Sequence, residues 1–230
     1  MRHCTAALTA AVLVAPTFLA AQGRTFQVPE NCTPVMTVQT RACTVSNFWT
    51  CDGESDGDMW RADSGQRGPF YLSRTDSEAQ WVESFGLVSG TAQTLKQPSA
   101  DPASFSDLVE NGLDAYDFVI VDQEGAEERV VGFDQLTGEE TEIDSEPLLV
   151  TEFAARITED DELVYAVEGQ QYISLRHRVF FSGVDTSMRP DEEPNTADRT
   201  PVSFAYPGEP GFLAATPVFG CNATDIALRP

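Results

Sequence analysis

An acidic stretch near the start of the chain has the residue types and the spacing for metal chemistry. Residues 52–63 read DGESDGDMWRAD. Numbered as a twelve-residue calcium loop, they place oxygen-bearing side chains at positions 1, 3, 5 and 12 and a glycine at position 6, where the backbone must turn sharply. Calcium takes six to eight oxygen ligands, and alternate residues of a tight loop point inward. The pattern predicts a calcium site with the candidate ligands Asp52, Glu54, Asp56, Asp58 and Asp63.

The residues that flank this stretch do not favour a helix-loop-helix unit. Residues 48–51 have the composition of a strand, and Gly65, Gly68 and Pro69 prevent a long helix from following. The twelfth position is also an aspartate, shorter than the usual glutamate. The alternative is a solvated hairpin turn in an acidic protein, and the sequence leaves both interpretations open.

Cysteines supply a second pattern. After the N-terminal segment, four remain, and an even number in an exported chain indicates two disulfides: Cys32, Cys43, Cys51 and Cys221. Three pairings are open. A continuous strand would hold Cys43 and Cys51 roughly 26 Å apart, so that pair requires a chain reversal. A zinc site is the weaker interpretation, because the chain has no C-x-x-C pair and only a distant histidine.

His177 is the one histidine beyond the N-terminal segment, so any catalytic triad would have to use it. It falls on an apolar stripe, where we expect an interior residue or one that lines a cavity. The chain has no G-x-S-x-G elbow, no H-E-x-x-H motif and no glycine-rich phosphate loop. Its 37 acidic residues also make any carboxylate pair chosen for glycoside chemistry uninformative. These observations favour a binding protein over an enzyme, with calcium as the one cofactor under consideration.

Residues 1–21 have the features of a secretory signal peptide. Arg2 and His3 precede an apolar run of about 14 residues, and Ala20 and Ala21 supply the small residues of a cleavage site. This run is shorter than the roughly 20 residues of a spanning helix, and no later run reaches that length. We therefore expect a periplasmic or secreted protein with no membrane span in the mature chain.

The chain is strongly acidic. It carries 37 Asp and Glu residues against 14 Lys and Arg residues, a formal net charge of −23. Such a surface repels nucleic acid and anionic lipid headgroups. It favours cations or a basic protein partner, and we expect no nucleic-acid partner.

Strand signals dominate the rest of the chain. From Tyr116 onward, period-two alternation predicts five consecutive antiparallel strands, which end with a strand from Gln171 to Ser182. Turns are expected at residues 122–125 and 136–139. In each of four strands, three alternating residues are expected to lie on the same face: Tyr116, Phe118 and Ile120; Arg129, Val131 and Phe133; Phe153, Ala155 and Ile157; and Leu163, Tyr165 and Val167. The expected earlier strands cover residues 35–41, 44–51, 59–62, 70–74, 80–87 and 91–96.

One short helix interrupts these strands. Ser104 or Ser106 is expected to cap a helix that runs to about Asn111, with Gly112 as its stop. Because a sheet this wide twists and exposes its edges, it usually curls. The sequence predicts an all-β fold, mainly an antiparallel meander that forms a closed or half-closed barrel-like sheet, with one short α-helix. Residues 22–230 are expected to form a single β-rich domain with an acidic loop at residues 185–200.

Aromatic residues suggest what such a sheet could enclose. Trp49, Trp60 and Trp81 fall in the early strands, where aromatic clusters fill cores or line pockets. A barrel of about eight strands leaves room for one small ligand. The leading prediction is therefore non-enzymatic binding of a small or lipophilic ligand in the periplasm. The alternative is a structural or interaction module of the cell envelope, stabilised by calcium or bound to a basic protein through its acidic surface.

Overall fold

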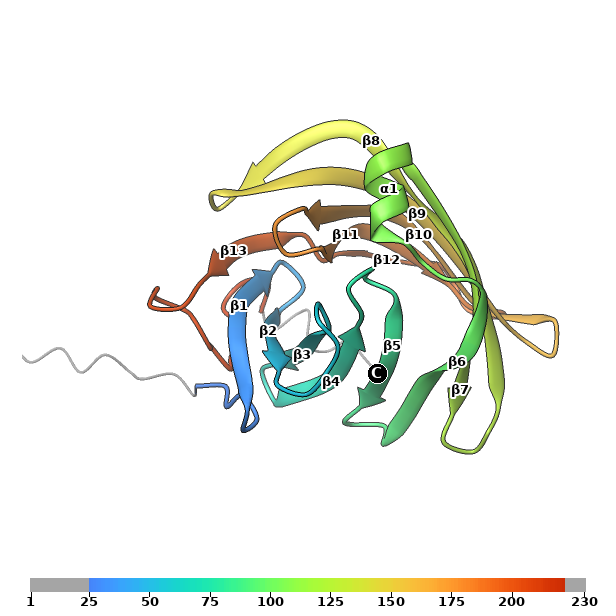
Figure 1. Cartoon of the computed structure of the whole chain (residues 1–230), viewed down its shortest axis with the longest axis horizontal. Helices are drawn as coiled ribbons and strands as arrows, with labels where there is room; N and C mark the ends of the chain where they lie inside the picture. The colour runs from blue at the N-terminus through green and yellow to red at the C-terminus, as the bar shows by residue number, and fades with distance from the viewer. Residues whose placement is uncertain (1–24, 222–230) are drawn as a thin grey trace, which may run out of the picture.

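The computed structural model describes residues 25–221, so the expected signal peptide lies outside the described residues. These residues form one thirteen-stranded antiparallel sheet and one helix, α1 (Phe105–Asn111) (Figure 1). Strands that follow one another in the chain are neighbours in the sheet up to β12, and β13 pairs with β1. The strands are β1 (Cys32–Thr40), β2 (Thr44–Cys51), β3 (Met59–Gly65), β4 (Gly68–Thr75), β5 (Trp81–Gly86), β6 (Thr91–Asp101), β7 (Leu113–Asp122), β8 (Glu127–Ile143), β9 (Glu146–Glu159), β10 (Glu162–Ser174), β11 (Val179–Met188), β12 (Asn195–Asp198) and β13 (Pro201–Ala205).

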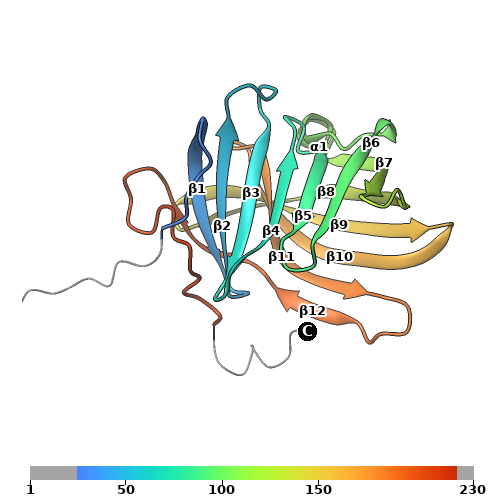
Figure 2. The ribbon, with the colours of Figure 1, turned by 90° about the horizontal axis from the view of Figure 1, so that it is seen from below.

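The sheet curls without closing. Its order runs from β12 at one edge through the meander to β1, and β13 forms the other edge. In Figure 2 the strands of the first half run up the picture, whereas β9 and β10 cross it, so the two halves of the sheet differ strongly in direction. Twist that accumulates over many strands produces this curl. The predicted all-β meander is confirmed, in its half-closed form.

Both edge strands belong to one short stretch of chain. Only Arg199 and Thr200 separate β12 from β13. The amide of Arg199 donates to the carbonyl of Gly183, 2.8 Å away, and the amide of Arg41 donates to the carbonyl of Thr200 at 3.0 Å. The chain therefore bridges the gap between the two edges, although no ladder of backbone hydrogen bonds closes the sheet.

Two disulfides reinforce the first strands and settle the open pairing. Cys32 is bonded to Cys51 across the β1–β2 hairpin, and Cys43 is bonded to Cys221 near the end of the described chain. The second bond closes a loop with a sequence separation of 178 residues. In the chain-entropy model, a loop of this length contributes about 5 kcal/mol by restricting the unfolded state.

The main core joins opposite walls of the curled sheet. Met36 and Val38 of β1 and Phe48 of β2 pack against Val179 and Phe181 of β11, with Leu148 and Phe204 in the same cluster. Met36 and Val38 are no more than 1% exposed. Apolar burial of this kind contributes roughly 2 kcal/mol for each large side chain, so this cluster holds the two halves together.

Helix α1 packs against the strands that follow it. Phe105 and Leu108 form a buried cluster with Ile173 of β10. Ser104 is the N-cap, since its side chain accepts a hydrogen bond from the amide of Asp107, and Gly112 ends the helix in the left-handed conformation at φ 79°. The predicted caps are confirmed. Within residues 25–221, no helix is long and apolar enough to cross a membrane.

Three local expectations were wrong. The turn expected at residues 136–139 is an irregularity within β8, because Gly138 adopts a positive φ of 82° without reversing the strand. The strand expected from Gln171 to Ser182 is instead the β10–β11 hairpin, and Leu175 is 51% exposed at its turn. The loop expected at residues 185–200 contains the end of β11 and all of β12, because cross-strand pairing outweighs its acidic, proline-containing composition.

Candidate functional site

A hollow of about 240 Å³ lies beneath α1 on the inner side of the curled sheet. We call it the α1 pocket. Its walls come from the turn between β4 and β5, the N-terminal end of α1, and strands β7 to β11. The lining residues are Glu78, Ala79, Gln80, Trp81, Ala103, Ser104, Phe105, Asp114, Tyr116, Phe118, Val130, Asp134, Phe153, Ala155, Gln171 and Phe180.

Strand register brings two aspartates together in this pocket. Asp114 of β7 is the direct cross-strand partner of Asp134 of β8. Side chains that face each other across an antiparallel pair lie about 5 Å apart at the Cβ atoms, and like charges there are destabilising. Asp114 is 7% exposed and Asp134 is 8% exposed, so little solvent screens the pair.

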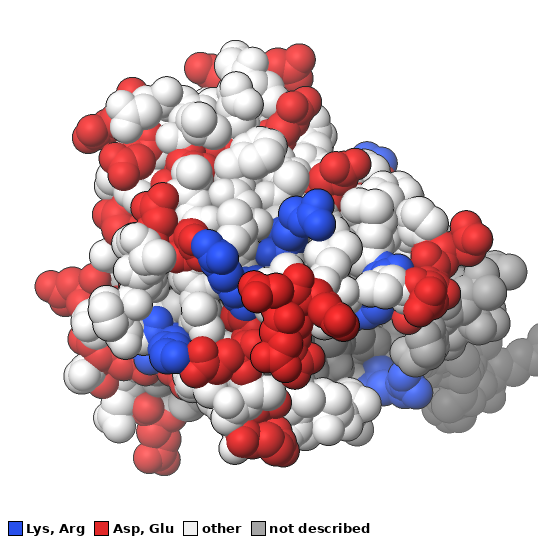
Figure 3. Space-filling view, turned by 90° about the vertical axis from the view of Figure 1, so that its right-hand side faces the viewer, with Lys and Arg blue, Asp and Glu red and all other residues white. Residues whose placement is uncertain are grey.

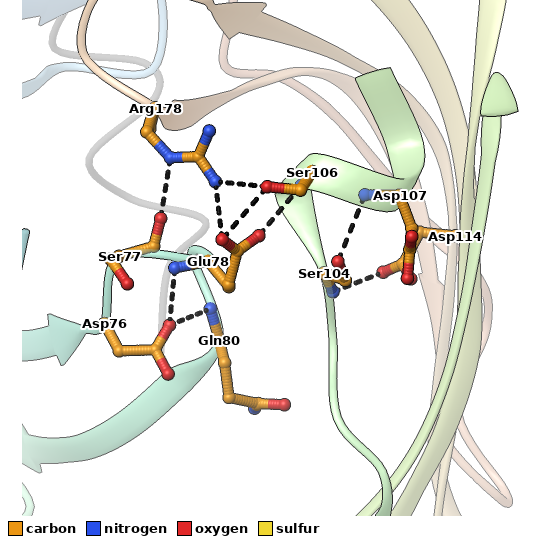
Figure 4. A network of polar contacts seen from close by, with 9 residues as sticks. All are labelled: Asp76, Ser77, Glu78, Gln80, Ser104, Ser106, Asp107, Asp114 and Arg178. Carbon is orange, nitrogen blue, oxygen red and sulfur yellow. Dashed lines mark hydrogen bonds and ion pairs between the residues drawn. The ribbon is translucent and has the colours of Figure 1, made fainter. Parts of the chain in front are cut away.

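Asp114 has a hydrogen-bond partner at the start of α1. The amide of Ser104 donates to its Oδ2 at 2.9 Å, and Figure 4 shows this contact beside the Ser104 cap. Burial raises the pKa of Asp114, and the Ser104 hydrogen bond opposes that rise. Asp114 is therefore the member of the pair that ionises first.

Asp134 has no such support. Among the described residues, none donates a hydrogen bond to its side chain and none forms an ion pair with it. Burial, with the charge of Asp114, raises the pKa of Asp134 to about 7. Near neutral pH, this carboxyl group therefore exchanges between its protonated and ionised forms inside the pocket.

A third polar group in the wall also lacks a partner. The Oε1 atom of Gln171 on β10 is buried, with no hydrogen-bond partner among the described residues. By contrast, both polar atoms of the Gln80 side chain are hydrogen-bonded: its Oε1 accepts from the amide of Ala103, and its Nε2 donates to the carbonyl of Trp81. The wall therefore contains unpaired acceptors beside a rigid, satisfied turn.

Aromatic rings form most of the remaining wall. Phe118 and Val130 belong to a buried cluster against which Trp81 and Tyr116 pack. Tyr116 lies against Gly132, where an added Cβ atom would come within 2.6 Å of the Tyr116 ring. A glycine at this point of β8 leaves space for the tyrosine beside the pocket.

A polar network fixes the rim of the pocket (Figure 4). Arg178, in the β10–β11 turn, lies 2.9 Å from Glu78 and donates to the carbonyl of Ser77 and the hydroxyl of Ser106. Glu78 also accepts from the amide and hydroxyl of Ser106 on α1. Burial acts to raise the pKa of Glu78, but these contacts hold it below its usual value. Two turns and the helix are thereby joined around the pocket mouth.

Two further hollows adjoin the α1 pocket. One of about 330 Å³ is lined by Arg61, Arg199 and Asp63 and lies toward β1, β2 and β13. A smaller one of about 100 Å³ is also lined by Arg61. Phe180 of β11 lines all three hollows, so its ring separates the acidic pocket from the arginine-lined hollow.

His177 is interior, as expected, but it belongs to a separate cluster. Its Nε2 lies 4.0 Å from Glu146, which accepts hydrogen bonds from Ser174 at 2.8 Å and Tyr206 at 2.5 Å. The imidazole stacks on Tyr206. Burial lowers the pKa of His177, while Glu146 acts to raise it and Arg176 to lower it.

The predicted calcium ligands do not converge. Asp58 lies 2.5 Å from Arg74, Asp63 accepts from Ser46, and Glu54 accepts from Trp60. The residues that the structure describes include no group of three or more His, Cys, Asp or Glu side chains placed to hold a metal. Calcium binding by Asp52, Glu54, Asp56, Asp58 and Asp63 stays a prediction, and three of these carboxylates already have protein partners.

The acidic surface is interspersed with basic side chains. Figure 3 shows red acidic groups spread over one face with blue basic groups between them. Several of the basic groups are paired: Lys96 with Glu127 at 2.5 Å and Arg129 with Asp117 at 2.5 Å. Exposed pairs of this kind contribute little stability, so the surface acts mainly through its net charge.

Comparison with protein-family models, curated proteins and solved structures found no match to this chain. The class of protein therefore rests on its fold and its pocket: an all-β half-barrel with a packed core and a pocket beneath α1. The sequence signal for this site was incomplete. Tyr116, Phe118, Phe153 and Ala155 were placed on strand faces from their spacing, but the pairing of Asp114 with Asp134 depends on strand register, which spacing does not give.

Proposed function

We propose that this protein binds a small ligand in the α1 pocket, without a catalytic step, in the periplasmic or extracellular space. The observation that carries the proposal is the pocket itself, a concave hollow of about 240 Å³ with aromatic walls and a few converging polar groups. Small-molecule sites have this composition. A fully packed interior would have argued against a carrier.

Export is supported by the disulfides and by the N-terminal sequence. Two disulfides persist in oxidising compartments outside the cytoplasm. Residues 1–21 have the pattern of a signal peptide. Mass spectrometry of the protein from an exporting host tests this part directly, because cleavage removes the mass of that segment.

The binding proposal is tested by filling the pocket. Ala155 lines it from β9, whereas Ala154 belongs to the opposite face and pairs with Phe133, which is 37% exposed. We expect naphthalene, a neutral fluorescent probe small enough for this volume, to bind the native protein with a change in its fluorescence. Ala155→Phe should weaken that binding about tenfold or more, because it occupies ligand space, and the matched Ala154→Phe should not.

A contrary result would be equally clear. If naphthalene binds neither the native protein nor Ala154→Phe, while circular dichroism shows all variants folded, the pocket does not bind apolar ligands and the proposal fails. Equal binding by all three proteins would place the probe elsewhere and would also contradict it. The interaction module, in which the acidic surface meets a basic protein, would then become the better proposal.

A further inference from the structure

Resting on the proposed function, we infer that the ligand is an organic cation: a small amine or quaternary ammonium group on an apolar body, held by Asp114 and Asp134. The inference begins with the charge of the wall. The carboxylates of Glu78, Asp114 and Asp134 line the pocket, and within the described residues no Lys, Arg or His does. Glu78 is paired with Arg178 at the rim, whereas Asp114 and Asp134 form no ion pair among the described residues. A ligand that enters therefore meets the uncompensated negative charge of these two aspartates.

Some hydrogen-bond acceptors in the pocket wall have no donor, and they indicate what a ligand would have to supply. The Oε1 of Gln171 is fully buried and has no donor among the described residues. The carboxylate of Asp134 keeps slight contact with solvent, and no described residue donates to it. The amides of Ala103 and Ser104 are already used inside the protein. A buried acceptor left unpaired costs free energy, and a buried carboxylate costs more. A ligand that supplies N–H donors or positive charge at this point would offset that cost.

The aromatic walls suit the same ligand. Trp81, Tyr116, Phe118 and Phe153 line the pocket together with the two aspartates. The faces of aromatic rings attract cations, and the attraction grows when water is excluded. Carboxylates with aromatic rings are a combination that recognises ammonium groups, whereas an anionic ligand would be repelled.

A bare metal ion fits this pocket poorly. Calcium requires six to eight oxygen ligands, and most of this wall is apolar. In the described part of the chain, no metal-binding group of three or more side chains was found. The volume of about 240 Å³ corresponds to roughly eight water molecules, which suits an organic molecule of about ten non-hydrogen atoms.

The neighbouring hollow differs in its charge. Arg61 and Arg199 line the 330 Å³ hollow that Phe180 also borders, and each is already paired, Arg61 with Asp63 at 3.3 Å and Arg199 with Asp185. That hollow therefore offers no unpaired carboxylate to a cation, whereas the α1 pocket does.

Binding should depend on pH, because a cation and a proton compete for Asp134. Asp114 and Tyr116 from β7, Phe153 from β9 and Gln171 from β10 line the pocket with this carboxyl group, and none of them is basic. The basic group at the rim, Arg178, is paired with Glu78. As the pH falls below about 7, protonation of Asp134 removes one negative charge, so affinity for the cation should fall.

Isothermal titration with a pair of isosteres tests the inference. Phenyltrimethylammonium is the cationic probe, and tert-butylbenzene is its neutral counterpart of the same shape. At pH 8 we expect the cation to bind the native protein at least about tenfold more tightly than the neutral probe. Lowering the pH to 5 should weaken cation binding about tenfold or more and leave the neutral probe unaffected.

Two matched variants locate the effect. Asp134→Asn should remove most of the preference for the cation while leaving the neutral probe bound. Asp160→Asn should change neither, since Asp160 is exposed in the β9–β10 turn, where asparagine accepts its φ of 49°. Equal binding of both probes by the native protein would overturn the inference and leave the proposed function standing. Failure of both probes, together with failure of naphthalene, would overturn both.

Discussion

Two buried carboxyl groups in this molecule have opposite surroundings. Glu146, which is 2% exposed, accepts hydrogen bonds from the hydroxyls of Ser174 and Tyr206. Asp134, which is 8% exposed, lies opposite Asp114 on β7 and Phe153 on β9, and neither donates a hydrogen bond to its carboxyl group. Burial alone therefore does not distinguish a structural acid from a functional one. The difference is that the protein supplies hydrogen-bond donors to Glu146 and none to Asp134. We propose that a ligand supplies the missing partner of Asp134.

The largest effect is expected from removing the satisfied acid. Glu146→Leu should destabilise the protein by about 3 kcal/mol, because the buried hydroxyls of Ser174 and Tyr206 lose their acceptor. Urea denaturation measures the change, and Glu152→Leu, an exposed position on the same strand, is the control. If both variants lose the same stability, Glu146 is no more structural than a surface acid, and the comparison breaks down.

Removing the charge of Asp134, the acid without a donor, is expected to raise the stability of the protein. Because folding raises the pKa of Asp134 from 3.8 to about 7, the folded chain binds more protons than the unfolded chain between these values. The contribution of Asp134 to stability is therefore highest below about pH 4, falls as the pH rises, and stays low above about 7.

Asp134→Asn should thus stabilise the empty protein by about 2 kcal/mol at pH 8 and change little at pH 4, because the amide does not titrate. Thermal unfolding at both pH values measures the difference. Destabilisation at pH 8 would show that the ionised carboxylate is already well paired in the folded protein, contrary to the geometry of the pocket.

The smallest effect on stability is expected at His177, and its dependence on pH is opposite to that of Asp134. Burial lowers the pKa of His177, so the unfolded chain takes up its proton first as the pH falls below about 6.5. Its contribution to stability is therefore present above that value and is lost as the pH falls. His177→Phe keeps an aromatic ring against Tyr206 and should flatten this part of the stability profile. A profile unchanged between pH 5 and 7 would contradict the burial of this imidazole.

Local signals in the sequence predicted much of the fold. Ser104 and Gly112 mark the two ends of α1 because capping is short-range chemistry. Most strands follow from alternation in the same way. Gly138 was misleading, since a positive φ is compatible with a turn or with a bulge, and only the pairing of β8 with β9 decides between them.

The site was harder to predict because it depends on register. Val131 and Phe133 were grouped by their apolar character, yet they are 43% and 37% exposed, and the inner face of β8 carries Val130, Gly132 and Asp134. One signal was available: the face of Tyr116, Phe118 and Ile120, extended back by two residues, reaches Asp114. Its neighbour Asp134 follows only from the observed pairing of β7 with β8.

The short bridge between β12 and β13 has a consequence for how the molecule meets its surroundings. An exposed strand edge offers unpaired backbone groups to other chains and promotes aggregation. Here the two edge strands have four and five residues and follow each other within residues 195–205. The thirteen-stranded sheet thus ends on both sides in its two shortest strands, so each edge strand offers another chain only four or five residues to pair with.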